Sequence, residues 1–116
     1  MAKNFIEMGQ TIGFIATSDV LSGQAVAIES LVIIAHGDVK SGEEGVGHAQ
    51  GVFELLKKTA TEIAQGADVY LTGGEIGTDT SGVYAGKAWN AAASGTEAVW
   101  VALNFGSPAA VEEPAG

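Results

Sequence analysis

Short apolar runs separated by glycine-containing turns recur along the whole chain. Runs of this length fit β-strands better than helices, which need ten or more residues to bury a face. The 17 glycines among 116 residues are about twice the usual frequency. They fall between the runs without a fixed period, as turn residues do. The clearest runs occupy residues 13–17, 24–28, 31–35, 51–55, 67–71 and 98–104.

The pattern predicts an all-β fold, a small β-sandwich or barrel for which a β-clip is one candidate form. The run at 31–35 is apolar at every position, so we expect it to be covered on both faces. Glu29-Ser30 forms a tight link before it, and the last two strands form a hairpin across residues 91–96. The expected strands cover residues 11–17, 24–28, 31–35, 46–57, 67–72, 83–89 and 98–104, with a polar loop at 37–45 and a wide glycine turn at 73–77.

One region also fits a helix, and the fold prediction allows at most one short helix, near residues 54–65. Leu55, Thr59 and Ile63 recur at intervals of four residues, and Gly66 stands where a helix often ends. The competing interpretation places Phe53 and Leu55 on one face of a strand. The sequence leaves both open.

The domain organisation follows from where apolar residues occur. Residues 1–10 form an N-terminal arm, residues 11–105 a single β domain, and residues 106–116 a flexible acidic tail. The tail contains both prolines of the chain and two glutamates, but few large apolar residues. It therefore buries too little surface to offset the entropy cost of ordering.

Composition excludes several classes of function. The chain has no cysteine, so disulfide scaffolds, thiolate metal sites and cysteine nucleophiles are excluded. It has no arginine, and five lysines against 14 acidic residues give a net charge of -9. Such a chain repels nucleic acid and anionic membranes, so neither is an expected partner. Neither a signal peptide nor a membrane-spanning run is apparent, which indicates a soluble acidic protein.

A glycine-lysine sequence resembles a phosphate-binding loop at first sight. Only three residues separate Gly82 from Gly86, where the motif needs four, and Ala88 replaces the hydroxyl residue that would reach magnesium. The alternative is a strand glycine at which a neighbouring backbone comes close. We therefore expect no cofactor here.

Other reactive groups are sparse. His36 and His48 are 12 positions apart without a third ligand at a recognisable spacing, so we expect no metal site. No nucleophile motif accompanies them, and we assign no catalytic residue. An enzyme or ligand-binding domain that uses Asp68, Tyr70 or Glu54 in a cleft remains an alternative.

The two tryptophans lie within or beside strands of the expected hairpin. Trp89 and Trp100 could form a cross-strand pair in the core. Alternatively, they could form an exposed platform at a subunit contact, where tryptophan is enriched. The sequence does not separate these interpretations.

Several segments in order resemble a family of small phage proteins. That family is often mislabelled as a RecA/RadA-type phage recombinase, and is better described as capsid cement, or head decoration, proteins. Relatives commonly carry proline where Leu56 stands, so the local structure there is open. The similar segments are Met1-Ala-Lys-Asn-Phe, Leu21-Ser-Gly-Gln-Ala-Val, Gly51-Val-Phe-Glu-Leu-Leu-Lys, Gly66-Ala-Asp-Val-Tyr-Leu, Ala85-Gly-Lys-Ala and Ala98-Val-Trp-Val-Ala-Leu-Asn.

The resemblance implies a structural virion protein, not an enzyme. It would be made in the host bacterial cytoplasm and then stabilise an icosahedral phage capsid from outside as a homotrimer, with the major capsid protein as partner. We expect the arm to pair with the edge of a capsid strand. Another head-fibre or tail component remains the nearest alternative. The arm residues are Ala2, Lys3, Asn4, Phe5 and Ile6.

Overall fold

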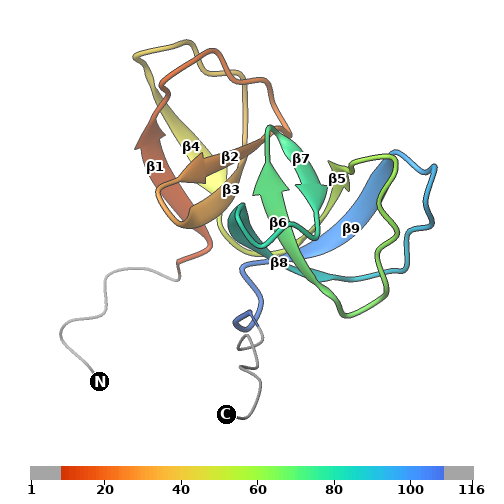
Figure 1. Ribbon diagram of the computed structural model, residues 1–116. Coiled ribbons are helices and arrows are strands. Elements are labelled where there is room, and N and C mark those ends of the chain that lie inside the picture. Colours follow the sequence, from red (N-terminus) through yellow and green to blue (C-terminus); the bar gives the residue numbers. More distant parts are fainter. Residues whose placement is uncertain (1–8, 109–116) are drawn as a thin grey trace, which may run out of the picture.

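The computed structural model describes residues 9–108, which form nine β-strands and no helix (Figure 1). The all-β prediction is therefore confirmed. The strands are β1 (Thr11–Ile15), β2 (Ala25–Ile28), β3 (Leu31–Ala35), β4 (Glu44–His48), β5 (Val52–Leu56), β6 (Asp68–Thr72), β7 (Glu75–Gly77), β8 (Val83–Ala88) and β9 (Ala98–Leu103).

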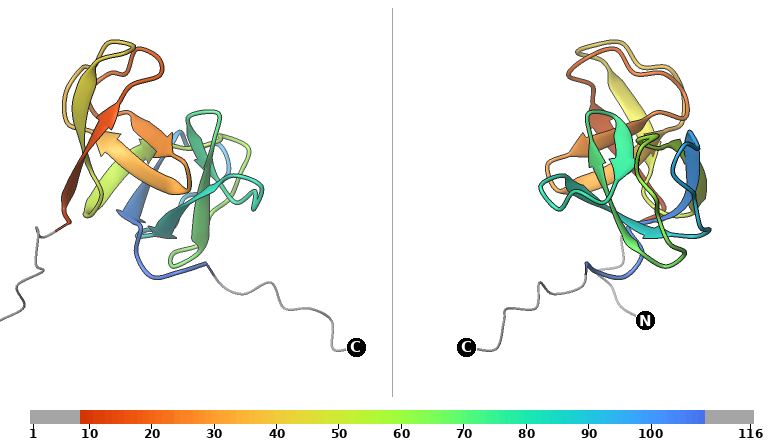
Figure 2. Two further views of the ribbon diagram at one scale, coloured as in Figure 1. Left: turned by 90° about the vertical axis from the view of Figure 1, so that its left-hand side faces the viewer. Right: turned by 45° about the vertical axis from the view of Figure 1, so that its right-hand side comes forward.

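The strands divide into two antiparallel sheets. One sheet has the order β1-β4-β3-β2, and the other has the order β5-β9-β8-β6-β7. The five-stranded sheet curls into a half-barrel, so that its two terminal strands approach each other (Figure 2). Lys57, just beyond β5, forms a parallel bridge with Ile76 of β7, and the Lys58 amide donates to the Ile76 carbonyl at 3.0 Å.

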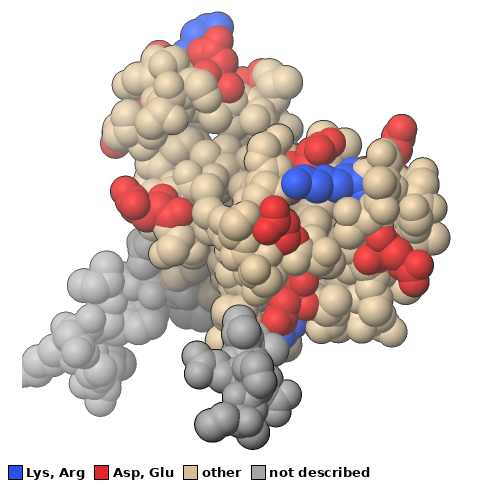
Figure 3. Space-filling model, viewed as in Figure 1, with Lys and Arg blue, Asp and Glu red and all other residues tan. Residues whose placement is uncertain are grey.

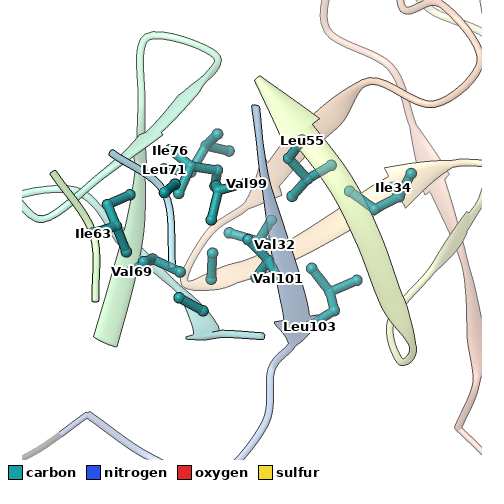
Figure 4. Packing of buried hydrophobic residues seen from close by; sticks show 13 residues of the cluster. Val32, Ile34, Leu55, Ile63, Val69, Leu71, Ile76, Val99, Val101 and Leu103 are labelled. Carbon is teal, nitrogen blue, oxygen red and sulfur yellow. The ribbon is translucent and has the colours of Figure 1, made fainter. Parts of the chain in front are cut away.

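The core forms two clusters that share β3. Val32 and Ile34 belong to the larger cluster, between the half-barrel and the four-stranded sheet (Figure 4). Ile33 and Ala35 face the other way, into a smaller cluster with Phe14. Burial on both faces explains why this strand is apolar throughout, as predicted from its sequence. The tight link at Glu29-Ser30 is also confirmed, because β2 and β3 pair directly across it.

The helical interpretation of residues 54–65 is wrong. Leu55 is 5% exposed and Leu56 is 64% exposed, which is the alternation of a strand. Beyond β5 the chain forms turns and short bridges instead of a helix, because it bonds to distant segments. Ile63 exchanges two hydrogen bonds of 2.8 Å with Ala92. Such tertiary pairing overrides the helical spacing of the apolar residues.

Two predicted boundaries differ from the structure. The extended stretch at 46–57 is two strands, broken before β5 at Gly51, whose φ of 118° suits glycine. The wide turn at 73–77 is instead a tight turn at Gly73-Gly74 followed by β7. The predicted final hairpin is confirmed, since β8 pairs with β9.

Candidate docking surface

Five large apolar side chains are exposed around the edge of the half-barrel that β5 forms. Each of them is 47–64% exposed. Neighbouring exposed apolar residues of this size typically mark interaction sites. We call this group the outer patch, and it comprises Val52, Leu56, Trp89, Trp100 and Phe105.

The strand register brings the outer patch together. Trp100 on β9 lies opposite Glu54, midway between Val52 and Leu56 on β5. The Trp89 amide donates to the Trp100 carbonyl at 2.7 Å, which extends the β8–β9 pairing by one residue. Outward positions of three neighbouring segments therefore form one surface.

Each tryptophan has a different partner. The Trp89 ring meets the Phe105 ring edge-on at a centroid distance of 5.7 Å. The Trp100 indole nitrogen donates to Glu54 Oε2 at 3.3 Å. Both tryptophans are 47% exposed, so the interpretation as a core pair is wrong. They are an exposed platform, and their role as a subunit contact stays a prediction.

Two shallow grooves flank Trp89 and Phe105. One has a volume of about 480 Å³ and extends along Gln65 and Gly66. The other has a volume of about 440 Å³ and extends along Val52. The two aromatic rings thus form a ridge between two grooves. A partner protein of complementary shape could pack against this ridge.

Polar contacts fix the chain beneath this ridge. The Tyr84 hydroxyl donates to the Phe105 carbonyl at 2.8 Å, and Lys87 Nζ donates to the Ser107 carbonyl at 3.1 Å. Lys87 also forms an ion pair with Asp68, and this hydrogen bond raises the pKa of Lys87. Burial raises the pKa of Tyr84. Both groups therefore keep their donor protons at neutral pH and hold Phe105 in place.

The glycine-lysine sequence lies in β8, not in a phosphate loop. A Cβ at Gly86 would lie 2.0 Å from the Ala102 carbonyl oxygen, so only glycine fits beside β9. The interpretation as a strand glycine is confirmed. Lys87, which would reach a phosphate in such a loop, pairs with Asp68.

The structure brings the two histidines together. His36 Nδ1 lies 3.0 Å from His48 Nε2, and the His48 ring lies 5.7 Å from that of Phe53. Among the described residues, no group of three or more histidine or acidic side chains could hold a metal ion.

The residues of the alternative catalytic site do not share a cleft. Asp68 and Tyr70 are on β6, and β9 and β8 lie between that strand and Glu54 on β5 within the sheet. Tyr70 packs edge-on against Tyr84 at 5.7 Å, and Glu54 accepts a hydrogen bond from Trp100. Their contacts are structural.

The structure places only part of the predicted site. The arm residues 2–6 lie outside the described residues. Sequence reasoning missed the contribution of Val52, Leu56 and Phe105 to the patch. The alternation in Val52-Phe-Glu-Leu-Leu56 carried a signal for the first two, but their exposure depends on which face of the half-barrel packs on the core.

The charges are spread over the surface rather than gathered at one site. Figure 3 shows acidic side chains and a few lysines separated by broad uncharged areas on one face. No helix of the described region has the length and apolar character to cross a membrane.

The described residues form an all-β domain with an exposed aromatic ridge, a feature typical of interaction surfaces. Residues 6–103 match the sequence model of the phage cement protein family, and the chain belongs to that family. No curated protein and no solved structure matches the chain. The family is one of structural proteins, which gives the chain a structural role in binding a phage capsid.

Proposed function

We propose that this protein binds the outer surface of an assembled phage capsid and stabilises it as a homotrimer. Family membership is the observation that carries the proposal. A protein that binds only the assembled shell stabilises that shell by mass action, without catalysis. Its partner is the major capsid protein, and its location is the exterior of the virion.

The outer patch supports contact between copies of the chain. Trp89 and Trp100 each remain half exposed in the single chain, and covering them would remove apolar surface from water. Tryptophan is also the residue type most enriched among energetically dominant interface positions. Glu54 on β5 lies opposite Trp100 and accepts a hydrogen bond from its indole nitrogen.

The N-terminal arm, Ala2–Ile6, is the proposed contact with the capsid. It precedes a fixed point of the fold, because the Gln10 carbonyl accepts a hydrogen bond of 2.8 Å from the Ala49 amide. An extended segment can add to the free edge of a capsid strand through main-chain hydrogen bonds. Phe5 and Ile6 would supply apolar contacts there.

Deletion of residues 2–6 tests this function. We expect the shortened protein to lose binding to empty capsids of its phage, measured by co-sedimentation, because the paired segment is gone. Its thermal unfolding should match that of the full chain, because the β domain begins at Thr11. Full binding by the shortened protein would refute the arm contact, and absence of binding by the full chain would refute the function.

A further inference from the structure

A further groove runs along the free edge of β2, away from the outer patch. Its volume is about 610 Å³. Every residue of β2 lines it, together with the end of β1 and the Gly73-Gly74 turn between β6 and β7. Because β1 and β2 are the two terminal strands of the four-stranded sheet, each has an edge that no described strand covers.

Main-chain groups of β2 face this groove. The Ala35 amide donates to the Gln24 carbonyl at 3.0 Å, one step beyond the pair Ala25–Ile34 that begins the β2–β3 register. Hydrogen-bonded pairs alternate along an antiparallel ladder. The amides and carbonyls of Ala25 and Ala27 therefore point away from β3, into the groove. An added strand would find donors and acceptors at strand spacing.

The lining of the groove determines which strand would fit. Ile15 is 61% exposed and Val26 and Ile28 of β2 are half-buried, and these three residues offer an apolar surface. Glu29, at the end of β2, is the charged side chain among the described lining residues. A segment with apolar residues at alternate positions and a lysine or arginine near Glu29 would complement both features.

We infer that the groove accepts an extended, basic-flanked segment of the capsid protein as a fifth strand beside β2. The inference rests on the proposed function and adds a second contact between this protein and the capsid. In this contact the capsid protein supplies the added strand, and this protein supplies the sheet edge. Edge pairing gives affinity through the main chain, while the alternate side chains give specificity. The acidic charge of the chain favours a basic partner segment over one of its own acidic segments.

Titration with a designed peptide tests the groove directly. The probe alternates valine and threonine and carries a lysine at each end. We expect NMR shifts along β2, and slowed hydrogen exchange of the Ala25 and Ala27 amides in the full-length protein. The same peptide with glutamate in place of lysine should bind about tenfold more weakly. Absence of any shift along β2 would overturn the inference.

Ala27→Pro is the key variant, because it removes the amide that faces the groove. Proline is tolerated at a sheet edge, so the fold should persist. Ala27→Val is the matched control, since it keeps the amide and suits a strand. We expect the Ala27→Pro variant to lose binding of the peptide and the Ala27→Val variant to retain it. Equal binding by both would overturn strand addition. Should Ala27→Pro unfold, Glu29→Gln serves instead, with an expected loss of salt dependence.

Capsid binding separates the inference from the proposed function. If Ala27→Pro binds empty shells about tenfold more weakly than Ala27→Val, the capsid is the source of the strand. If the full chain binds shells and both variants bind them equally, the capsid strand is refuted while the function stands. If the peptide binds but only copies of this chain compete for the groove, the strand belongs to a second copy and the inference is wrong. If the full chain fails to bind shells, the function itself fails.

Discussion

At the scale of single residues, a buried lysine organises the chain that leaves β5. Lys57 is 1% exposed. Its Nζ donates to the carbonyl of Lys58 at 2.8 Å, to that of Thr59 at 3.4 Å, and to that of Thr61. A buried ammonium group is costly unless hydrogen bonds replace its water. These three bonds fold the loop around the amine.

Replacing this amine should therefore destabilise the protein. We expect Lys57→Met, which keeps an apolar stem, to lower the free energy of unfolding by about 2–4 kcal/mol, because three carbonyls lose their donor. Urea denaturation measures the change. The control is Lys40→Met, an exposed position where the change should stay below about 0.5 kcal/mol. Equal effects at both positions would contradict the role of Lys57.

At the scale of elements, one asparagine joins the two sheets. Asn104 directly follows β9, and its side-chain nitrogen Nδ2 donates to the backbone carbonyls of Val32 and Ala49, each at 2.9 Å. These acceptors belong to β3 and to the link between β4 and β5. Asn104 has a φ of 52°, a left-handed conformation that asparagine tolerates better than most residues. Both its backbone and its side chain suit this position.

Two substitutions separate these contributions. Asn104→Gly keeps the left-handed backbone but removes both hydrogen bonds, so we expect the free energy of unfolding to fall by about 1–3 kcal/mol. Asn104→Ala removes the same bonds and also places alanine in a strained left-handed conformation. Its free energy of unfolding should therefore fall by about 1 kcal/mol more. Guanidinium denaturation measures both. A glycine variant as stable as the native chain would show that the side-chain bonds do not stabilise the contact between the sheets.

At the scale of the whole molecule, the outer patch predicts self-association. We expect Trp89→Ser or Trp100→Ser to raise the dissociation constant of the proposed trimer by at least about tenfold, because each loses apolar contact area in the proposed interface. Sedimentation equilibrium measures the constant. Leu21→Ser is the matched control, since Leu21 is 67% exposed but lies outside the patch. A native chain that stays monomeric would contradict the prediction.

Much of the fold was predictable because strand periodicity is local. The alternation around Leu55, the apolar run of β3 and the close approach at Gly86 follow from neighbouring residues and the needs of a sheet. The helical alternative at 54–65 could not be rejected locally, because bonds to distant residues, such as those of Lys58 with Ile76 and of Ile63 with Ala92, keep that segment from forming a helix. The candidate site was less predictable, since exposure depends on which face of each sheet the core covers.

The sequence alone determined an acidic, cysteine-free β domain that resembles phage cement proteins. Composition and short-range pattern suffice for this, because charge, strand length and turn residues are local properties. Only the tertiary structure decided that nine strands divide into two sheets, with Trp89 and Trp100 outward and Lys57 inward. It also placed the edge of β2 along a groove. These features depend on long-range pairing, which joins residues that no local pattern relates.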